Sequence, residues 1–84
     1  MNQKELVSKI GQRIKELRES KNISQQDLSA LCNFEKSNMS RIESGRTNMT
    51  VGSLLKISQA LNTSVSHLTD VENWFYTDKK TFGL

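Results

Sequence analysis

The sequence predicts an all-α domain of five helices, followed by a short aromatic-rich tail. Apolar residues recur at helical spacing along most of the chain, and residues suited to capping precede the expected helices. No alternating strand pattern is visible before residue 69. The chain contains no proline, so the ends of these helices must be set by caps, asparagine and glycine.

The first helix is indicated by an apolar stripe in the first twenty residues. Its members recur every three or four positions and are Leu6, Ile10, Ile14 and Leu17. We expect this helix to end near Asn22, because asparagine tolerates the left-handed conformation better than most residues that carry a side chain.

Two short helices should follow, over about residues 24–32 and 35–44. Ser24 can cap the first of them through its hydroxyl. Asn33 offers a left-handed break between the two, and Gly45 ends the second. The expected arrangement is therefore helix, tight turn, helix.

The last two expected helices have short apolar stripes, but residues suited to capping mark where they begin. Thr50 should cap the fourth helix and Asn62 should stop it, and Ser64 should cap a fifth that runs through Leu68. The apolar stripe of the fourth helix consists of Leu54, Ile57 and Leu61.

Composition restricts the classes of function. A chain of 84 residues makes one domain with a small core. Its single cysteine rules out an intrachain disulfide framework and is typical of a reducing compartment. No signal peptide and no apolar run of membrane-spanning length is visible, so we expect a cytoplasmic protein without membrane attachment.

The charge is positive and uneven. The net charge is +3; residues 1–68 carry ten basic and six acidic side chains, and residues 69–84 carry two and three. This balance permits a polyanionic partner without requiring one. No nucleophile–base pair, metal-ligand cluster or phosphate-binding glycine loop is present in the sequence, so we expect no enzyme activity, no cofactor and no metal.

The third expected helix has two distinct faces. On a helix of about 100° per residue, its polar side chains share one face: Lys36, Ser37, Ser40 and Arg41. Met39 and Ile42 share the opposite face. A polar face alone is more often merely solvated, so the context must decide what this one does.

The preceding helix supplies that context. Leu28, Cys32 and Phe34 can pack against the apolar face of the third helix. The pair then forms a helix-turn-helix, with the polar face of the third helix turned outward. A protruding helix fits the DNA major groove, where arginine and lysine can donate to guanine and serine can pair with several bases.

Two stretches carry a family resemblance. Ser24-Gln25-Gln26-Asp27-Leu28 opens the helix-turn-helix, and Ser40-Arg41-Ile42-Glu43-Ser44-Gly45 closes it. The segment resembles the Cro and repressor type of helix-turn-helix domain, often called Xre-like, over about residues 8–68. Three positions that are usually glycine in that family are asparagine here: Asn22, Asn33 and Asn62. Because asparagine is the least costly replacement at a left-handed position, the substitutions agree with the resemblance.

The resemblance implies roles for individual residues. The base-reading set it implies is Lys36, Ser37, Ser40 and Arg41, with Asn38 as an additional candidate. The phosphate-binding candidates are Gln25, Arg46 and Asn48, and more weakly Arg13. It also implies an ion pair between Arg18 and Glu43 that ties the first helix to the third. By contrast, we expect Cys32 to be a core residue and His67 to have a surface or capping role.

The function that these features favour is sequence-specific binding of double-stranded DNA. We expect a transcription regulator that acts as a repressor and binds as a homodimer to a palindromic operator, with its third helices about 34 Å apart. Two alternatives stay open. The protein could be the antitoxin of a toxin–antitoxin pair, binding both DNA and a toxin, or an interaction module that no longer binds DNA.

The tail, residues 69–84, lies beyond the resemblance and differs in composition from the domain of residues 1–68. Its large apolar residues are Val71, Trp74, Phe75, Tyr76 and Phe82, too many for a disordered end. The pattern does not distinguish a hairpin or edge strand from a further helix. Exposed apolar patches usually mark contact surfaces. The tail could therefore fold back onto the first and fifth helices, add to a homodimer contact or bind another protein, and our hypothesis is that it helps to form the dimer.

Overall fold

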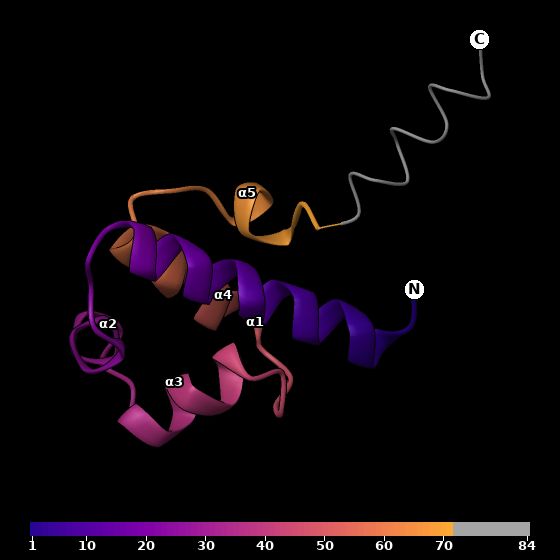
Figure 1. Ribbon diagram of the computed structural model, residues 1–84, viewed down its shortest axis with the longest axis horizontal. Coiled ribbons are helices and arrows are strands. Elements are labelled where there is room, and N and C mark those ends of the chain that lie inside the picture. The colour runs from indigo at the N-terminus through magenta and orange to yellow at the C-terminus, as the bar shows by residue number, and fades with distance from the viewer. Residues whose placement is uncertain (72–84) are drawn as a thin grey trace, which may run out of the picture.

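The computed structural model of the protein describes residues 1–71. This part contains five α-helices and no strand, which confirms the all-α prediction (Figure 1). The helices are α1 (Gln3–Ser20), α2 (Gln25–Cys32), α3 (Lys36–Glu43), α4 (Val51–Ala60) and α5 (Val65–Thr69). None of them is long and apolar enough to cross a membrane. Of the apolar tail residues, only Val71 is described. Trp74, Phe75, Tyr76 and Phe82 lie outside the described residues, and so does the expected hairpin, edge strand or helix.

Side-chain caps set the starts of four helices. The side-chain oxygens of Asn2, Ser24, Thr50 and Ser64 each accept a hydrogen bond from the backbone amide three residues later. This satisfies one of the amides that the first turn of a helix leaves unpaired. Three of these caps were predicted from the sequence. Helix α3 begins without one, because Glu35 makes no side-chain capping bond.

Left-handed residues mark the breaks between helices. Asn22, Asn33 and Asn62 have φ angles of 58°, 58° and 54°, as the sequence predicted. Gly45, just past α3, has a φ of 75°. A side chain there would be strained by the backbone conformation and would also approach Cα of Ser8 to 2.7 Å, so glycine is needed for two reasons.

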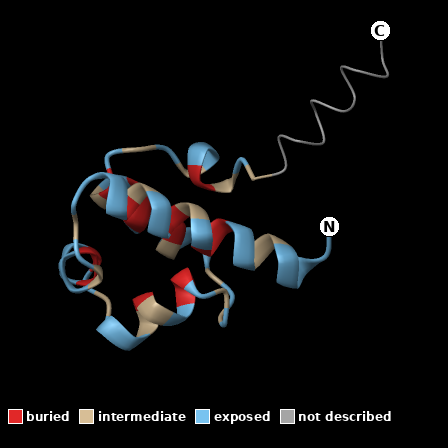
Figure 2. Cartoon of the chain, viewed as in Figure 1, coloured by how far each residue is buried: buried red, intermediate tan, exposed pale blue. Residues whose placement is uncertain are grey.

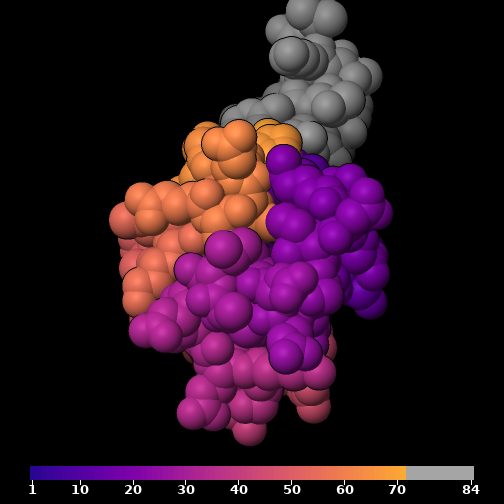
Figure 3. Space-filling model, turned by 90° about the vertical axis from the view of Figure 1, so that its left-hand side faces the viewer, coloured from indigo at the N-terminus to yellow at the C-terminus, as the bar shows by residue number. Residues whose placement is uncertain are grey.

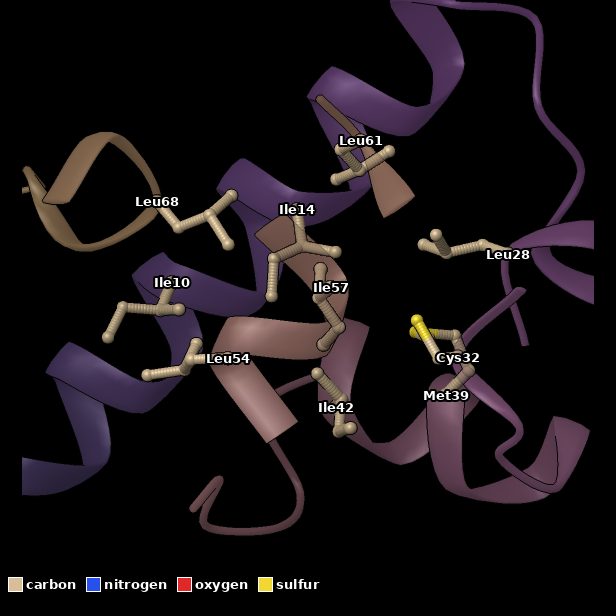
Figure 4. Close-up of a cluster of buried hydrophobic side chains, with 10 residues drawn as sticks. All are labelled: Ile10, Ile14, Leu28, Cys32, Met39, Ile42, Leu54, Ile57, Leu61 and Leu68. Carbon is tan, nitrogen blue, oxygen red and sulfur yellow. The ribbon is translucent and has the colours of Figure 1, made fainter. Parts of the chain in front are cut away.

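The core draws on all five helices (Figure 4). Its buried apolar members are Ile10, Ile14, Leu28, Cys32, Met39, Ile42, Leu54, Ile57, Leu61 and Leu68. Figure 2 shows that the buried segments face the interior, while most of the outer surface of each helix is exposed. Phe34, in the turn between α2 and α3, packs partly on this core, and the ammonium of Lys56 lies 5.7 Å from the centre of its ring.

Helix α1 separates the helix-turn-helix from α5. It packs against α3 on one side and against α5 on the other (Figure 1). The approach to α3 is close at Gly11, where an added Cβ would lie 2.9 Å from the Glu43 carbonyl oxygen and would collide with that of Ile42. The absence of a side chain at Gly11 therefore allows the two helix backbones to meet.

Candidate nucleic-acid interface

The outward face of α3 has the geometry that its sequence predicted. Lys36, Ser37 and Arg41 are exposed, and Ser40 and Asn38 are partly buried at the edges of this face. On the opposite side, Met39 is 0 % and Ile42 2 % exposed. In the space-filling view, the segment around α3 forms the lower end of the molecule, away from α5 (Figure 3). A polar, basic helix face is thus presented at one end of the domain.

A buried ion pair holds α3 in this position. Arg18 Nε donates to Glu43 Oε2 at 2.8 Å, and Arg18 Nη2 donates to Oε1 at 3.1 Å. Both residues are less than 10 % exposed. The hydrogen bond that Arg18 donates to Glu43 raises the pKa of the guanidinium, against the opposing effect of burial. The third nitrogen, Nη1, donates to the Ile23 carbonyl at 2.8 Å, so the guanidinium also fixes the chain just before α2. The pair that the resemblance implied between these two residues is therefore present.

Gln25 lies at the start of α2, as expected, but its side chain has an internal partner. Its amide Nε2 donates to Glu43 Oε1 at 3.1 Å. The carboxylate of Glu43 consequently bonds α1 through Arg18 and α2 through Gln25. This bond uses one of the two N–H groups of Nε2, and the backbone amides at the start of α2 are further donors that a phosphate could use.

Arg13 is placed away from the helix-turn-helix. Its Nε donates to the His67 carbonyl at 3.2 Å and its Nη2 to the Asp70 carbonyl at 3.0 Å. On α1, Arg13 is about 200° around the helix from Gly11, which faces α3. Arg13 therefore joins α1 to the end of α5, and the structure does not bring it together with the other candidate DNA contacts.

Arg46 and Asn48 lie together on the loop between α3 and α4. Both are exposed. Arg46 Nε donates to the hydroxyl of Ser44 at 2.8 Å, and Asn48 accepts a hydrogen bond from the side-chain amide of Gln3 at 3.2 Å. The loop and the start of α1 enclose a cleft of about 360 Å³, which Lys4 also lines.

A second hollow, of about 180 Å³, lies where α1, α2 and α3 meet. Its lining includes Lys15, Gln25, Ser40, Glu43 and Ser44. Neither Lys4 nor Lys15 was predicted from the sequence as a DNA contact. Their spacing relative to Gly11, seven and four residues, places all three on one face of α1, and this was the signal that could have identified them.

The remaining chemistry-bearing residues have structural surroundings. Cys32 is 3 % exposed within the core, as predicted, and burial raises the pKa of its thiol. His67 is exposed, and its backbone amide donates to the capping hydroxyl of Ser64. Within residues 1–71, no cluster of three or more His, Cys, Asp or Glu side chains could hold a metal ion.

Comparison with known proteins identifies the architecture. The profile of a helix-turn-helix family, HTH_3, matches residues 14–68, which is more than half of the chain. The chain belongs to this family. The match confirms the resemblance to the Cro and repressor type, and it covers all of α2 to α4 and most of α5. A search of curated proteins found no match.

Solved structures of regulators share the fold. The restriction-modification controller protein C.AhdI from Aeromonas hydrophila is 36% identical, with a TM-score of 0.72 over 76% of this chain and 96% of its own. The complex of the SinR and SinI proteins contains a chain that is 32% identical, with a TM-score of 0.71 over 87% of this chain and 78% of that one.

A third match extends the pattern to a longer protein. An HTH_3-family transcriptional regulator from Vibrio cholerae is 26% identical, with a TM-score of 0.75, over 95% of this chain and 42% of its own. The family match and the matched structures are those of DNA-binding transcription regulators, and this is the general class of the protein.

Proposed function

We propose that this protein is a sequence-specific regulator that represses transcription as a homodimer bound to a palindromic operator. The observation that carries the proposal is the outward face of α3. It presents Lys36 and Arg41 to solvent at one end of the molecule, and the buried pair of Arg18 and Glu43 fixes its orientation. A rigidly supported, basic helix face is what insertion into a major groove requires.

The proposed contacts divide into two kinds. Base edges are read by the α3 side chains Lys36, Ser37, Asn38, Ser40 and Arg41. Phosphates are bound by Arg46 and Asn48 on the following loop and by the backbone amides at Gln25. Arg13 is not included, because its guanidinium is bonded to carbonyls at the end of α5. Phosphate contacts position the domain, and only the α3 contacts carry sequence information.

Dimerisation is proposed from the requirements of such an operator. One α3 covers only a half-site, and two copies related by a two-fold axis would reach half-sites about 34 Å apart. We propose that residues 69–84 contribute to this contact, since their apolar residues need a partner surface. Val71, the last described residue, is partly buried against the core. It follows α5 by two residues, and α5 lies on the other side of α1 from α3 (Figure 1). The tail therefore begins away from the proposed DNA face.

Repression is the proposed consequence of binding. A dimer that occupies a promoter excludes polymerase from it, and this needs no surface besides the DNA contacts and the dimer contact. The proposal places the protein in the cytoplasm, in agreement with its single thiol.

Selection of bound sequences from random duplex DNA tests this function directly. We expect enrichment of a two-fold symmetric sequence and a stoichiometry of two chains per selected duplex. A reporter gene downstream of the selected site should lose expression when the protein is supplied. Failure to enrich any sequence would contradict base-specific recognition, and activation of the reporter would contradict repression.

A second candidate is binding to another protein in addition to DNA, as an antitoxin does. The observation in its favour is that the matched SinR chain is found in a complex with the SinI protein. Co-expression with the neighbouring genes, followed by purification, tests it. A stoichiometric partner that binds through residues 69–84 would favour this candidate. If the partner bound while no DNA was selected, the chain would be an interaction module only.

A further inference from the structure

One face of α1 is directed at the helix-turn-helix and carries two lysines. The residues that share this face are Lys4, Ser8, Gly11, Lys15 and Arg18, which follow one another at intervals of four, three, four and three. On a helix of about 100° per residue they lie within about 80° of one another. Any contact that fixes the middle of this stripe therefore fixes the direction of its ends.

Three contacts fix it. Gly11 lies against the backbone of α3 at Ile42 and Glu43, and Gly45 lies against Ser8. Arg18 bonds to Glu43. The stripe thus faces α3 and the loop that follows it. Lys4 lies N-terminal to the three contacts, and Lys15 lies between Gly11 and Arg18.

Lys4 lines the cleft of about 360 Å³ formed by the loop residues Arg46, Thr47 and Asn48. The hydrogen bond from Gln3 to Asn48 joins the two walls of this cleft. No acidic residue of the described chain lines it, so its two charged side chains are both cations. The cleft combines positive charge with hydroxyl and amide groups, which suits a phosphate oxygen.

Lys15 lines the smaller hollow beside Ser40 and Ser44, on the edge of α3 that faces outward. The start of α2, with its unpaired amides, borders the same hollow at Gln25. Glu43 also lines it, but its two oxygens are bonded to Arg18 and Gln25. No ion pair joins Lys4 or Lys15 to a carboxylate of residues 1–71.

We propose that Lys4 and Lys15 bind the two phosphate backbones that border the major groove when α3 occupies it. This inference rests on the proposed DNA-binding function and adds the contribution of α1 to it. Eleven residues of helix separate the lysines by about 16 Å, which is comparable to a major groove about 12 Å wide with a backbone on each side. Lysine binds phosphate as a flexible point charge, so these residues position the dimer without reading its sequence.

The salt dependence of binding tests the proposal. The full-length variants Lys4→Gln and Lys15→Gln are compared with Lys9→Gln, which removes the same charge from an exposed position of α1 that borders Arg13 and Asp70. Affinity for the selected operator and for random duplex is measured across a range of salt concentrations. Thermal melting of each variant checks that the fold is kept.

Lys4→Gln and Lys15→Gln should each lower the slope of log K against log salt by about 0.9 per half-site, on operator and random DNA alike. Lys9→Gln should change the slope by much less. Lys4→Arg keeps the positive charge and should keep the slope of the unaltered protein. Equal slopes for Lys9→Gln and the two test variants would overturn the proposal while the DNA-binding function stood. A loss confined to the operator would overturn it by indicating base contacts. If the unaltered protein bound no DNA, the proposed function itself would fail.

Discussion

The guanidinium of Arg18 and the carboxylate of Glu43 meet in two hydrogen bonds inside the protein, 25 residues apart in the sequence. They join the helix that forms the body of the domain to the helix that forms its polar face. Gln25 adds a third bond to the same carboxylate. The orientation of α3 is therefore set by its buried C-terminal turn, which leaves the opposite face free.

Loss of Arg18 should destabilise the protein strongly. Arg18→Ala leaves the Glu43 carboxylate buried without its cation, which costs about 3–5 kcal/mol in comparable sites. For a domain of this size we expect the melting temperature to fall by more than about 10 °C. The variant Lys21→Ala, at an exposed position, is the control. An unchanged melting temperature in Arg18→Ala would show that the pair does not support the fold.

Alanine at two glycines should have opposite effects. In Gly11→Ala the new Cβ would collide with the Ile42 carbonyl and force α1 away from α3, at a cost of about 1–3 kcal/mol. In Gly52→Ala the new Cβ meets only the Thr50 hydroxyl oxygen, at 3.8 Å, and the unfolded chain loses freedom, which should stabilise by about 0.4–1 kcal/mol. Chemical denaturation measures both. Equal effects at the two positions would contradict the close α1–α3 contact.

Replacement of Arg41 should affect sequence recognition. Arg41→Ala removes a side chain from the exposed face of α3, and we expect a loss of about 1–3 kcal/mol on the operator and a relaxed preference at one base pair per half-site. Arg46→Ala is the comparison, because a phosphate contact should weaken binding to all sequences and lower the salt slope by about one unit. If Arg41→Ala lost affinity equally on random DNA, Arg41 would not be a base reader.

Removal of residues 72–84, which carry all of the tail's aromatic side chains, should separate the subunits. A chain that ends at Val71 keeps the Arg13 bonds to His67 and Asp70 and all of the core described above. We expect it to fold, to sediment as a monomer at micromolar concentration and to bind a half-site weakly. If the shortened chain stayed a dimer with full operator affinity, the dimer contact would lie within residues 1–71, and the tail would be a candidate site for another protein.

The thiol of Cys32 should be unreactive in the folded protein. Burial raises its pKa above the ordinary value of 9.0, so less thiolate is present at pH 8 than in the unfolded chain. Alkylation should therefore be slow in buffer and fast in denaturant. The folded protein keeps the thiol protonated to higher pH than the unfolded chain does. Above about pH 9 the unfolded chain loses this proton first, so the free energy of unfolding should fall as the pH rises further. Rapid alkylation of the native protein would show that α2 opens readily from the core.

Much of the fold and part of the site are determined by interactions between residues that are close together in the sequence. A capping hydroxyl at Ser24, Thr50 or Ser64 acts on an amide three residues away, and an asparagine at Asn33 ends a helix through its own backbone conformation. The polar face of α3 follows from helical periodicity alone. These features depend on local chemistry, and the sequence was sufficient to predict them.

The partners of the long polar side chains were decided only by the tertiary structure. Arg13 and Lys15 are both basic residues of α1, two positions apart, and nothing local distinguishes them. The packing of Gly11 on α3 turns Lys15 toward the helix-turn-helix and Arg13 toward the carbonyls of α5. Gln25 likewise has its partner in Glu43, eighteen residues away. Such pairings depend on which helix faces meet, and that is settled by how the whole core packs, so a residue's type and position could not reveal them.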